Sequence, residues 1–353
     1  MSALAFRDAS VTGALRAAFS VCIDILLPYY VASRSIRDSE GLRHALAGFA
    51  LAAMILSLLT IFEVARTWKL YGGLLSVLGV NEQLFGFYLF RSGFLRPNVT
   101  LGNSIVLGYV IAVGLGFFLY LSAFLTKPVH RWLGFGVLVA GTLASLSRGP
   151  WVGAACLILV FILMGPRPLR QLTRMVLGGA AVLLLINLLP TGRLLIDMLP
   201  FIGSVEQGNV EYRANLLTVA LPVIERNLLF GSPDFLEAPE MQVMLQGEGI
   251  IDVVNTYIGV ALYSGLVGLM LFVGAFGLAL LQLRAGIRIA RRHDARDAVL
   301  GRALFATLAS IMLIIYTASS IFAVPVVYWP VIGLCVAYAG AMKAHTRTVK
   351  EAP

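Results

Sequence analysis

The chain contains a series of apolar runs, each long enough to form a helix across a lipid bilayer. Such a helix needs roughly 20 mostly apolar residues, or somewhat fewer where charged side chains at its ends reach the interface. Only 13% of the 353 residues are charged, against about 25% in a typical soluble domain. The sequence therefore predicts an all-α, polytopic transmembrane helical bundle that forms a single integral membrane domain over residues 1–353.

About nine spans are predicted, with one long loop between the sixth and the seventh. The spans fall at residues 12–33, 44–63, 104–125, 131–147, 150–165, 173–190, 252–283, 302–322 and 324–342. The loop, residues 191–251, is rich in arginines and carboxylates. A hydrophobic membrane protein has little structural need for such a segment, so we expect it to bind a ligand or to take part in catalysis.

The basic residues set the orientation of these spans. One set of connecting segments carries 17 of the 27 Lys and Arg residues, and the opposite set carries 10. By the positive-inside rule the first set is cytoplasmic, so the 191–251 loop, residues 64–103 and the tight corner at 147–150 are external. The net charge of +9 thus reflects topology, and we expect the lipid bilayer and no nucleic acid as a partner.

Nine spans and a cytoplasmic C-terminus place the N-terminus outside, although no signal peptide precedes the first span. We expect that the chain lacks upstream helices that a complete relative would have. The alternative is that the first run, which contains Arg16 and Asp24, does not cross the membrane.

Arginines on the predicted outer face are the candidates for ligand binding. Arg148 lies at the corner between two spans, Arg91 lies before the third span, and Arg213 lies in the long loop. The planar guanidinium suits a phosphate or a carboxylate. The alternative for each is an interfacial arginine that reaches the lipid headgroups.

The remaining chemistry of the outer face is that of carboxylates. All four histidines lie in or beside predicted cytoplasmic segments, and the three cysteines lie in apolar runs without metal-ligand spacing. There is no nucleotide-binding glycine motif. We therefore expect no metal and no cofactor. Arginines with a carboxylate base suit an anionic substrate such as a lipid-linked diphosphate.

Several short motifs follow one another along the chain. They are Arg91-Ser-Gly-Phe with Gly102-Asn103, Ser147-Arg148-Gly149, Arg213 followed by residues 220–231, and Val254-Asn255-Thr-Tyr-Ile258 leading into Ser264-Gly265-Leu-Val-Gly268. Their order resembles the O-antigen ligase and O-antigen polymerase superfamily of bacterial membrane proteins. That family combines a helical bundle with a Ser-Arg-Gly corner and one long periplasmic loop. The loop begins with an arginine helix and ends in a His-Asn-x-x-Leu motif before a glycine-containing span.

The resemblance implies an activity at the outer, periplasmic face of the bacterial inner membrane. Members of the family transfer a glycan from an undecaprenyl-diphosphate carrier to a sugar hydroxyl. The acceptor is lipid A core for ligases and another repeat unit for polymerases. The resemblance implies an enzyme of this kind, a glycosyltransferase that uses a lipid-diphosphate donor and needs no metal.

The same resemblance assigns roles to individual residues. Arg148 and Arg213 correspond to the arginines that contact the diphosphate, and Arg91 is a weaker candidate. Val254 occupies the position of the family's loop-end histidine, so Asp252 or Glu248 would have to replace it as the base. Otherwise the chain is a divergent or inactive member. Asp252 also has a purely structural alternative as the N-terminal cap of the following helix.

Two other functions compete with ligase-like transfer. An exopolysaccharide repeat-unit polymerase of the same superfamily differs only in its acceptor. A transporter or flippase for an anionic lipid-linked substrate predicts an internal repeat and charges near the middle of the bilayer. We find no repeat, and the charges cluster at the outer interface, so glycan transfer is the favoured interpretation.

Overall fold

The computed structural model describes residues 10–72, 77, 88–91, 93–188, 207–246, 249–321 and 323–351. Helices make up 79% of the structure, which confirms the all-α class. Among the described residues, six helical segments are long and apolar enough to cross a membrane: Val11–Arg34, Ser39–Arg66, Ser104–Phe124, Thr256–His293, Ala295–Tyr316 and Ala323–Ala344. The chain is thus a multi-pass membrane protein.

Three of the predicted spans form helices that fall outside this group of six. They are α7 (Pro128–Ala144), α8 (Arg148–Leu163) and α9 (Pro168–Leu188). The first two have 17 and 16 residues. α9 carries Arg170 and Arg174 in its first two turns. A helix of 16 residues is about 24 Å long, less than the roughly 30 Å of a bilayer core. The number of nine spans stays a prediction.

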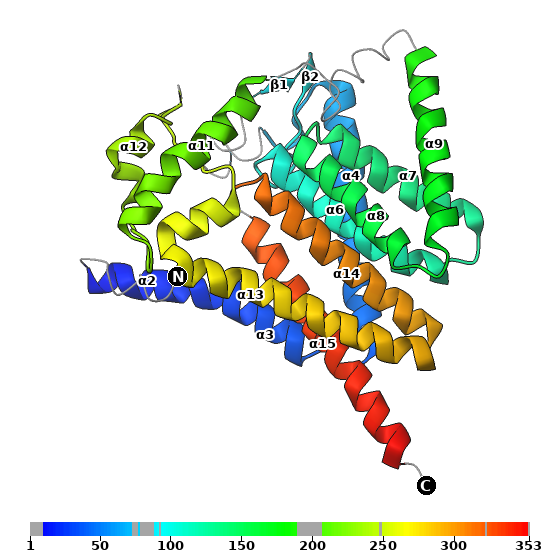
Figure 1. The fold of residues 1–353 in the computed structure, drawn as a ribbon. Helices are drawn as coiled ribbons and strands as arrows, with labels where there is room; N and C mark the ends of the chain where they lie inside the picture. Colours follow the sequence, from blue (N-terminus) through cyan, green and yellow to red (C-terminus); the bar gives the residue numbers. More distant parts are fainter. Residues whose placement is uncertain are drawn as a thin grey trace. The chain divides into compact units, whose positions relative to one another are not determined.

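Contacts divide the chain into two compact units, and the helices of both are drawn in Figure 1. Unit 1 comprises Met1–Arg37, Glu206–Ala285 and Ile315–Pro353. Unit 2 comprises Asp38–Val205 and Gly286–Ile314.

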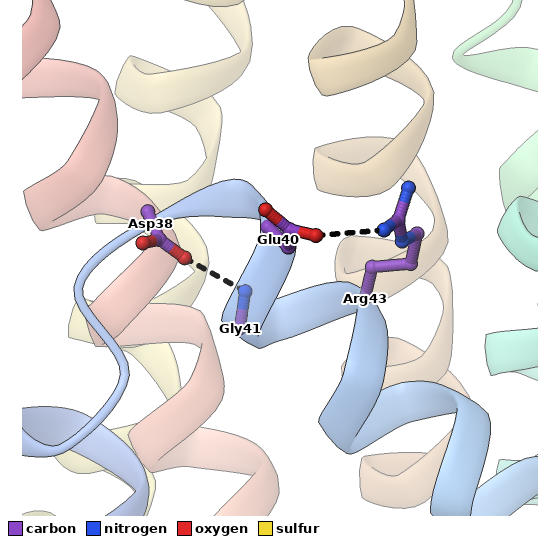
Figure 2. A network of polar contacts seen from close by, with 4 residues as sticks. All are labelled: Asp38, Glu40, Gly41 and Arg43. Carbon is purple, nitrogen blue, oxygen red and sulfur yellow. Dashed lines mark hydrogen bonds and ion pairs between the residues drawn. The ribbon is translucent and has the colours of Figure 1, made fainter.

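Unit 2 is a helical bundle in which α4 (Ser39–Arg66) contacts α6 (Ser104–Leu121) and α7, and α6 also contacts α8. Asp38 caps α4, because its Oδ1 accepts a 2.7 Å hydrogen bond from the Gly41 N–H. One turn later, Arg43 forms an ion pair with Glu40 (Figure 2). Unit 2 also contains the 3₁₀ turn η3 (Ser122–Phe124), the paired strands β1 (Phe90–Arg91) and β2 (Phe94–Leu95), α9 and most of α14 (Ala295–Tyr316).

Small residues allow the helices of unit 2 to pack closely. A Cβ on Gly114 of α6 would lie 2.2 Å from the Cβ of Ala53 on α4. A Cβ on Gly141 of α7 would lie 2.4 Å from the Cβ of Ser57, also on α4. Close backbone approach at small residues is the usual means by which helices associate in a membrane.

Unit 1 contains the N-terminal helical segment, the helices of the long loop and the C-terminal helix. The first predicted span forms α2 (Val11–Val21), the π-helical turn η1 (Cys22–Leu26) and α3 (Leu27–Arg34), and α3 packs on α15 (Ala323–Glu351). The loop forms α11 (Gln207–Arg226), η4 (Phe235–Glu237) and α12 (Pro239–Gln242).

One face of α11 is apolar and buried. Leu216, Ala220 and Val223 are buried and pack with Met241, Met244 and Leu262. Their spacing places them on one face of the helix.

The structure corrects several span boundaries. α13 (Thr256–His293) extends ten residues beyond the predicted end at 283 and is broken at Gly265, which has φ 64° and ψ −168°. α14 ends at Tyr316 instead of 322, and residues 317–321 form a loop before α15. Apolarity does not distinguish this loop from a helix, because its structure depends on hydrogen bonds to other segments.

Candidate functional site

Asp252 lies in the extended segment before α13 and is held in place through both its side chain and its backbone. The hydroxyl of Ser319 donates a 2.5 Å hydrogen bond to the Asp252 carboxylate. The hydroxyl of Tyr212 on α11 donates a 3.0 Å hydrogen bond to the Asp252 carbonyl. The residue is half-buried. An oriented carboxylate of this kind can accept a proton from a bound hydroxyl group.

Arg213 lies on the exposed side of α11, next to Tyr212. Its Nη2 donates a 3.3 Å hydrogen bond to the carbonyl of Thr317. Thr317 belongs to the same short loop as Ser319, so the structure brings Arg213 and Asp252 to one loop. These are the two site residues predicted in unit 1 that the structure describes.

The first residue of α13 also contacts the loop at 317–321. The Thr256 hydroxyl donates a 2.8 Å hydrogen bond to the carbonyl of Ala318, and both residues are buried. Asn255 caps the helix, because its Oδ1 accepts hydrogen bonds from the N–H groups of Tyr257 and Ile258 at 2.9 and 3.2 Å. The alternative in which Asp252 is the helix cap is therefore wrong.

A large cavity of about 780 Å³ lies within unit 1, and Asp252 forms part of its wall. One part of the lining is polar and includes Asn255, Thr256 and Ser319. Another part is apolar and aromatic and includes Phe272 and Trp329. Concave sites with an apolar wall and a few grouped polar side chains are typical of ligand binding.

In unit 2, Arg91 is buried and supports the corner that leads into α8. Its Nη1 donates a 2.6 Å hydrogen bond to the carbonyl of Leu146. Leu146 has φ 51°, a left-handed conformation that is uncommon for a leucine. Strained backbone that the surroundings stabilise is frequent at functional sites. The structure thus brings Arg91 to the corner that carries Arg148.

Arg148 is the first residue of α8 and is half-buried. The helix has no acidic residue in its first turn, and the Ser147 side chain does not cap it. Ser147 instead contacts the Ser104 hydroxyl at 3.3 Å. A helix N-terminus carries partial positive charge, so a guanidinium at this position adds to a local preference for an anion.

Glu63 at the end of α4 is a buried carboxylate that the sequence did not single out. It is 1% exposed and accepts backbone hydrogen bonds from Leu70, Asn98 and Val99 at 3.1 to 3.2 Å. It therefore ties the segment after α4 to the segment before α6. Burial lowers the pKa of the neighbouring Lys69 amine, whereas Glu63 acts in the opposite direction.

Two other charged residues of the long loop are Arg226 and Glu248. Arg226 at the end of α11 forms an ion pair with Glu240 on α12, which indicates a structural role. A hydrogen bond from its own backbone N–H lowers the pKa of the Glu240 carboxyl, and Arg226 acts in the same direction. Glu248, the second candidate base, lies outside the described residues.

Comparison with known proteins gives one family. Residues 133–273 match the family model described as O-antigen ligase. Over these residues the chain is similar to O-antigen ligases. The superfamily indicated by the sequence motifs is thereby confirmed, and the matched region contains Arg148, Arg213 and Asp252. Arg91 lies outside it. No curated protein matches the chain at a significant level.

The structure gives a physical reason for two glycines in the O-antigen ligase motifs. Gly231, with φ 68°, ends the turn after α11, and a Cβ there would lie 2.6 Å from the Gly265 nitrogen. A Cβ on Gly265 would lie 2.4 Å from the carbonyl carbon of Leu229. The two backbones touch, so neither position has room for a side chain.

The contact between this turn and α13 also replaces backbone hydrogen bonds that α13 loses at its break. The N–H groups of Leu266 and Val267, just after the break, donate to the carbonyls of Leu228 and Leu229 at 2.8 and 3.2 Å. Broken helices are tolerated in membrane proteins when other segments satisfy the freed backbone groups. The turn at 227–231 and the glycine-containing span of the O-antigen ligase domain therefore form one structural element.

Val254, which the motif resemblance aligns with the family's histidine, packs against the apolar cluster of α11 and α12. The side chain at this position has a packing role, which leaves Asp252 as the ionisable group in the described part of this segment. The sequence missed Ser319, Thr256 and Tyr212. For Ser319 the only indication in the sequence was the presence of three hydroxyl residues, Thr317, Ser319 and Ser320, inside a predicted span.

Proposed function

We propose that the chain transfers a glycan from an undecaprenyl-diphosphate carrier to a sugar hydroxyl at the outer face of the inner membrane, as an O-antigen ligase does. The single observation that supports this most is the Asp252 carboxylate. It lies in the wall of a cavity, accepts a hydrogen bond from Ser319, and shares a loop with Arg213. A fixed carboxylate and a guanidinium that contact the same short loop suit base-assisted transfer from a phosphorylated donor.

The reaction forms one bond and breaks another. The acceptor oxygen attacks the anomeric carbon of the donor glycan, and the bond from that carbon to the diphosphate oxygen breaks. The electron pair of that bond leaves with undecaprenyl diphosphate. The proton of the acceptor hydroxyl passes to Asp252 and from there to water.

Arginines stabilise the leaving group. Negative charge on the diphosphate grows as the glycosidic bond breaks, so a fixed guanidinium stabilises the transition state more than the ground state. We assign this role to Arg213 in unit 1 and to Arg148 in unit 2. Arg91 has a supporting role, because its guanidinium holds the Leu146 carbonyl next to Arg148.

The membrane arrangement is part of the proposal. We infer a single integral membrane domain of about nine spans, with the 191–251 loop and the site in the periplasm. The asymmetry of 17 against 10 basic residues supports this orientation. α8 is consistent with it, because Arg291 and Arg302 of the predicted cytoplasmic set donate to the carbonyls of Met164 and Phe161 at its C-terminal end.

Reconstitution of the full chain in liposomes that contain an undecaprenyl-diphosphate-linked glycan tests the activity. Transfer predicts that free undecaprenyl diphosphate appears in step with glycan joined to an added acceptor. Lipid A core as the productive acceptor indicates a ligase, and a second repeat unit indicates a polymerase. Movement of the intact lipid-linked glycan across the bilayer, with no cleavage, would show a flippase and contradict the proposal.

A further inference from the structure

The cavity in unit 1 differs in charge from a phosphate-binding site. Twenty-three described residues line it, and Asp252 is the only charged side chain among them. A phosphate group placed there would meet a carboxylate and no lysine, arginine or histidine from the described lining. Like charges within a few ångströms repel each other. The described part of the lining therefore disfavours the diphosphate itself.

The polar part of the lining suits a hydroxyl-bearing group. Hydroxyl and amide side chains line the same cavity as Asp252, among them Ser319, Ser320, Asn255 and Gln246, and Ser319 contacts the carboxylate directly. These groups can donate or accept hydrogen bonds and carry no charge. A sugar hydroxyl bound at this end would lie next to the carboxylate that we propose as the base.

The rest of the lining suits an apolar chain. Val21 and Ile25 from the N-terminal segment, and Leu271 and Phe272 from α13, line the same cavity. Phe272 lies in an aromatic group with Tyr328 and Trp329, with ring centroids 5.8 and 6.1 Å apart. Aromatic side chains provide a large apolar surface. One cavity thus combines a polar end, where Asp252 is the only charged side chain of the described lining, with an apolar wall, as an amphiphilic ligand requires.

We propose that this cavity is the acceptor subsite and that it binds a glycolipid with an uncharged, hydroxyl-bearing sugar at the Asp252 end and an apolar chain along Leu271 and Phe272. The term acceptor rests on the proposed function, because Asp252 removes the proton of the attacking hydroxyl. The binding of an uncharged glycolipid rests only on the lining of the cavity.

Trp329 provides a direct readout of binding. The full chain is placed in phospholipid nanodiscs, with Trp68, Trp132 and Trp151 replaced by Phe. A brominated alkyl maltoside is then titrated, followed by a brominated alkyl phosphate of the same chain length. We expect saturable quenching of the Trp329 fluorescence by the maltoside, and at least tenfold weaker binding of the phosphate. Equal binding of both probes, or quenching that never saturates, would overturn the proposal.

A matched pair of variants tests whether the brominated alkyl maltoside binds in this cavity. Gly259 lines the cavity, and a Cβ there would meet only the Val253 side chain at 3.6 Å, so Gly259→Phe fills the cavity without a backbone clash. Gly277 on the same helix is not part of the lining and has nothing within 4 Å, so Gly277→Phe is the control. We expect Gly259→Phe to abolish saturable quenching and Gly277→Phe to keep it. Equal quenching in both variants would contradict the assignment.

The two proposals fail in different ways. Saturable maltoside binding in a protein that never cleaves the lipid-linked donor would retain the uncharged-glycolipid site and remove the proposed function. Glycan transfer by a protein that shows no saturable maltoside binding would retain the function and remove the acceptor subsite.

Discussion

The hydroxyl of Ser319 donates a 2.5 Å hydrogen bond to the carboxylate of Asp252, although the two residues are 67 positions apart. This contact joins the loop between α14 and α15 to the segment before α13. Arg213 contacts the same loop at Thr317. The proposed base and one proposed diphosphate-binding residue are therefore positioned by one short loop.

Removal of this hydroxyl tests the positioning role of the loop. In Ser319→Ala the carboxylate loses a charge-assisted hydrogen bond, a type worth about 1.5–3 kcal/mol. We expect transfer to fall about tenfold or more, because a misoriented base contributes less. Ser319→Thr keeps the hydroxyl and should recover part of the activity. Wild-type rates in Ser319→Ala would show that the bond has no part in catalysis.

The same loop shows why the sequence predicts part of the site only. The spans were recognisable because long apolar runs constrain the chain locally. Residues 317–322 are small or apolar, so they extended the predicted span. Ser319 could not be found, since its partner lies far away in the sequence. The sequence places Asp252 at the start of a predicted span, but α13 begins at Thr256, and the Ser319 and Tyr212 contacts hold Asp252 in its position.

The break at Gly265 was equally inaccessible to sequence analysis, because it depends on the turn at 227–231. Gly265→Ala places a Cβ 2.4 Å from the Leu229 carbonyl group at a residue with positive φ. We expect a loss of about 2–4 kcal/mol in unfolding free energy, from backbone strain and overpacking. Thermal unfolding in detergent measures it. Gly274→Ala has open space and should be neutral or slightly stabilising, and equal stability of the two variants would refute the close contact.

Arg148 is expected to act through its planar guanidinium. Arg148→Lys keeps the charge but loses the two parallel donors that match a phosphate. We expect transfer to fall about 100-fold, similar to the loss of one preorganised donor in other enzymes, with normal membrane insertion. Arg226→Lys is the control, because Arg226 is paired with Glu240, and it should keep nearly full activity. Full activity in Arg148→Lys would leave Arg148 as an interfacial anchor only.

The membrane orientation is tested by cysteine labelling. Cys22, Cys156 and Cys335 are first replaced by Ala, and single cysteines are then placed at the exposed positions Glu211 and Ala295. A membrane-impermeant thiol reagent added outside should label the first position and not the second. Labelling of both from one side would contradict the inferred topology and the periplasmic site.

The most direct test of the account is the transfer rate of Asp252→Asn in reconstituted liposomes. Asparagine keeps the size of the side chain and an oxygen that accepts the Ser319 hydrogen bond, but it cannot take up a proton. Asn255, and not Asp252, caps α13, so stability should be unchanged. We predict a loss of about 100-fold or more in transfer, as for removal of a general base, with unaltered thermal unfolding. A wild-type transfer rate in Asp252→Asn would contradict the proposed mechanism.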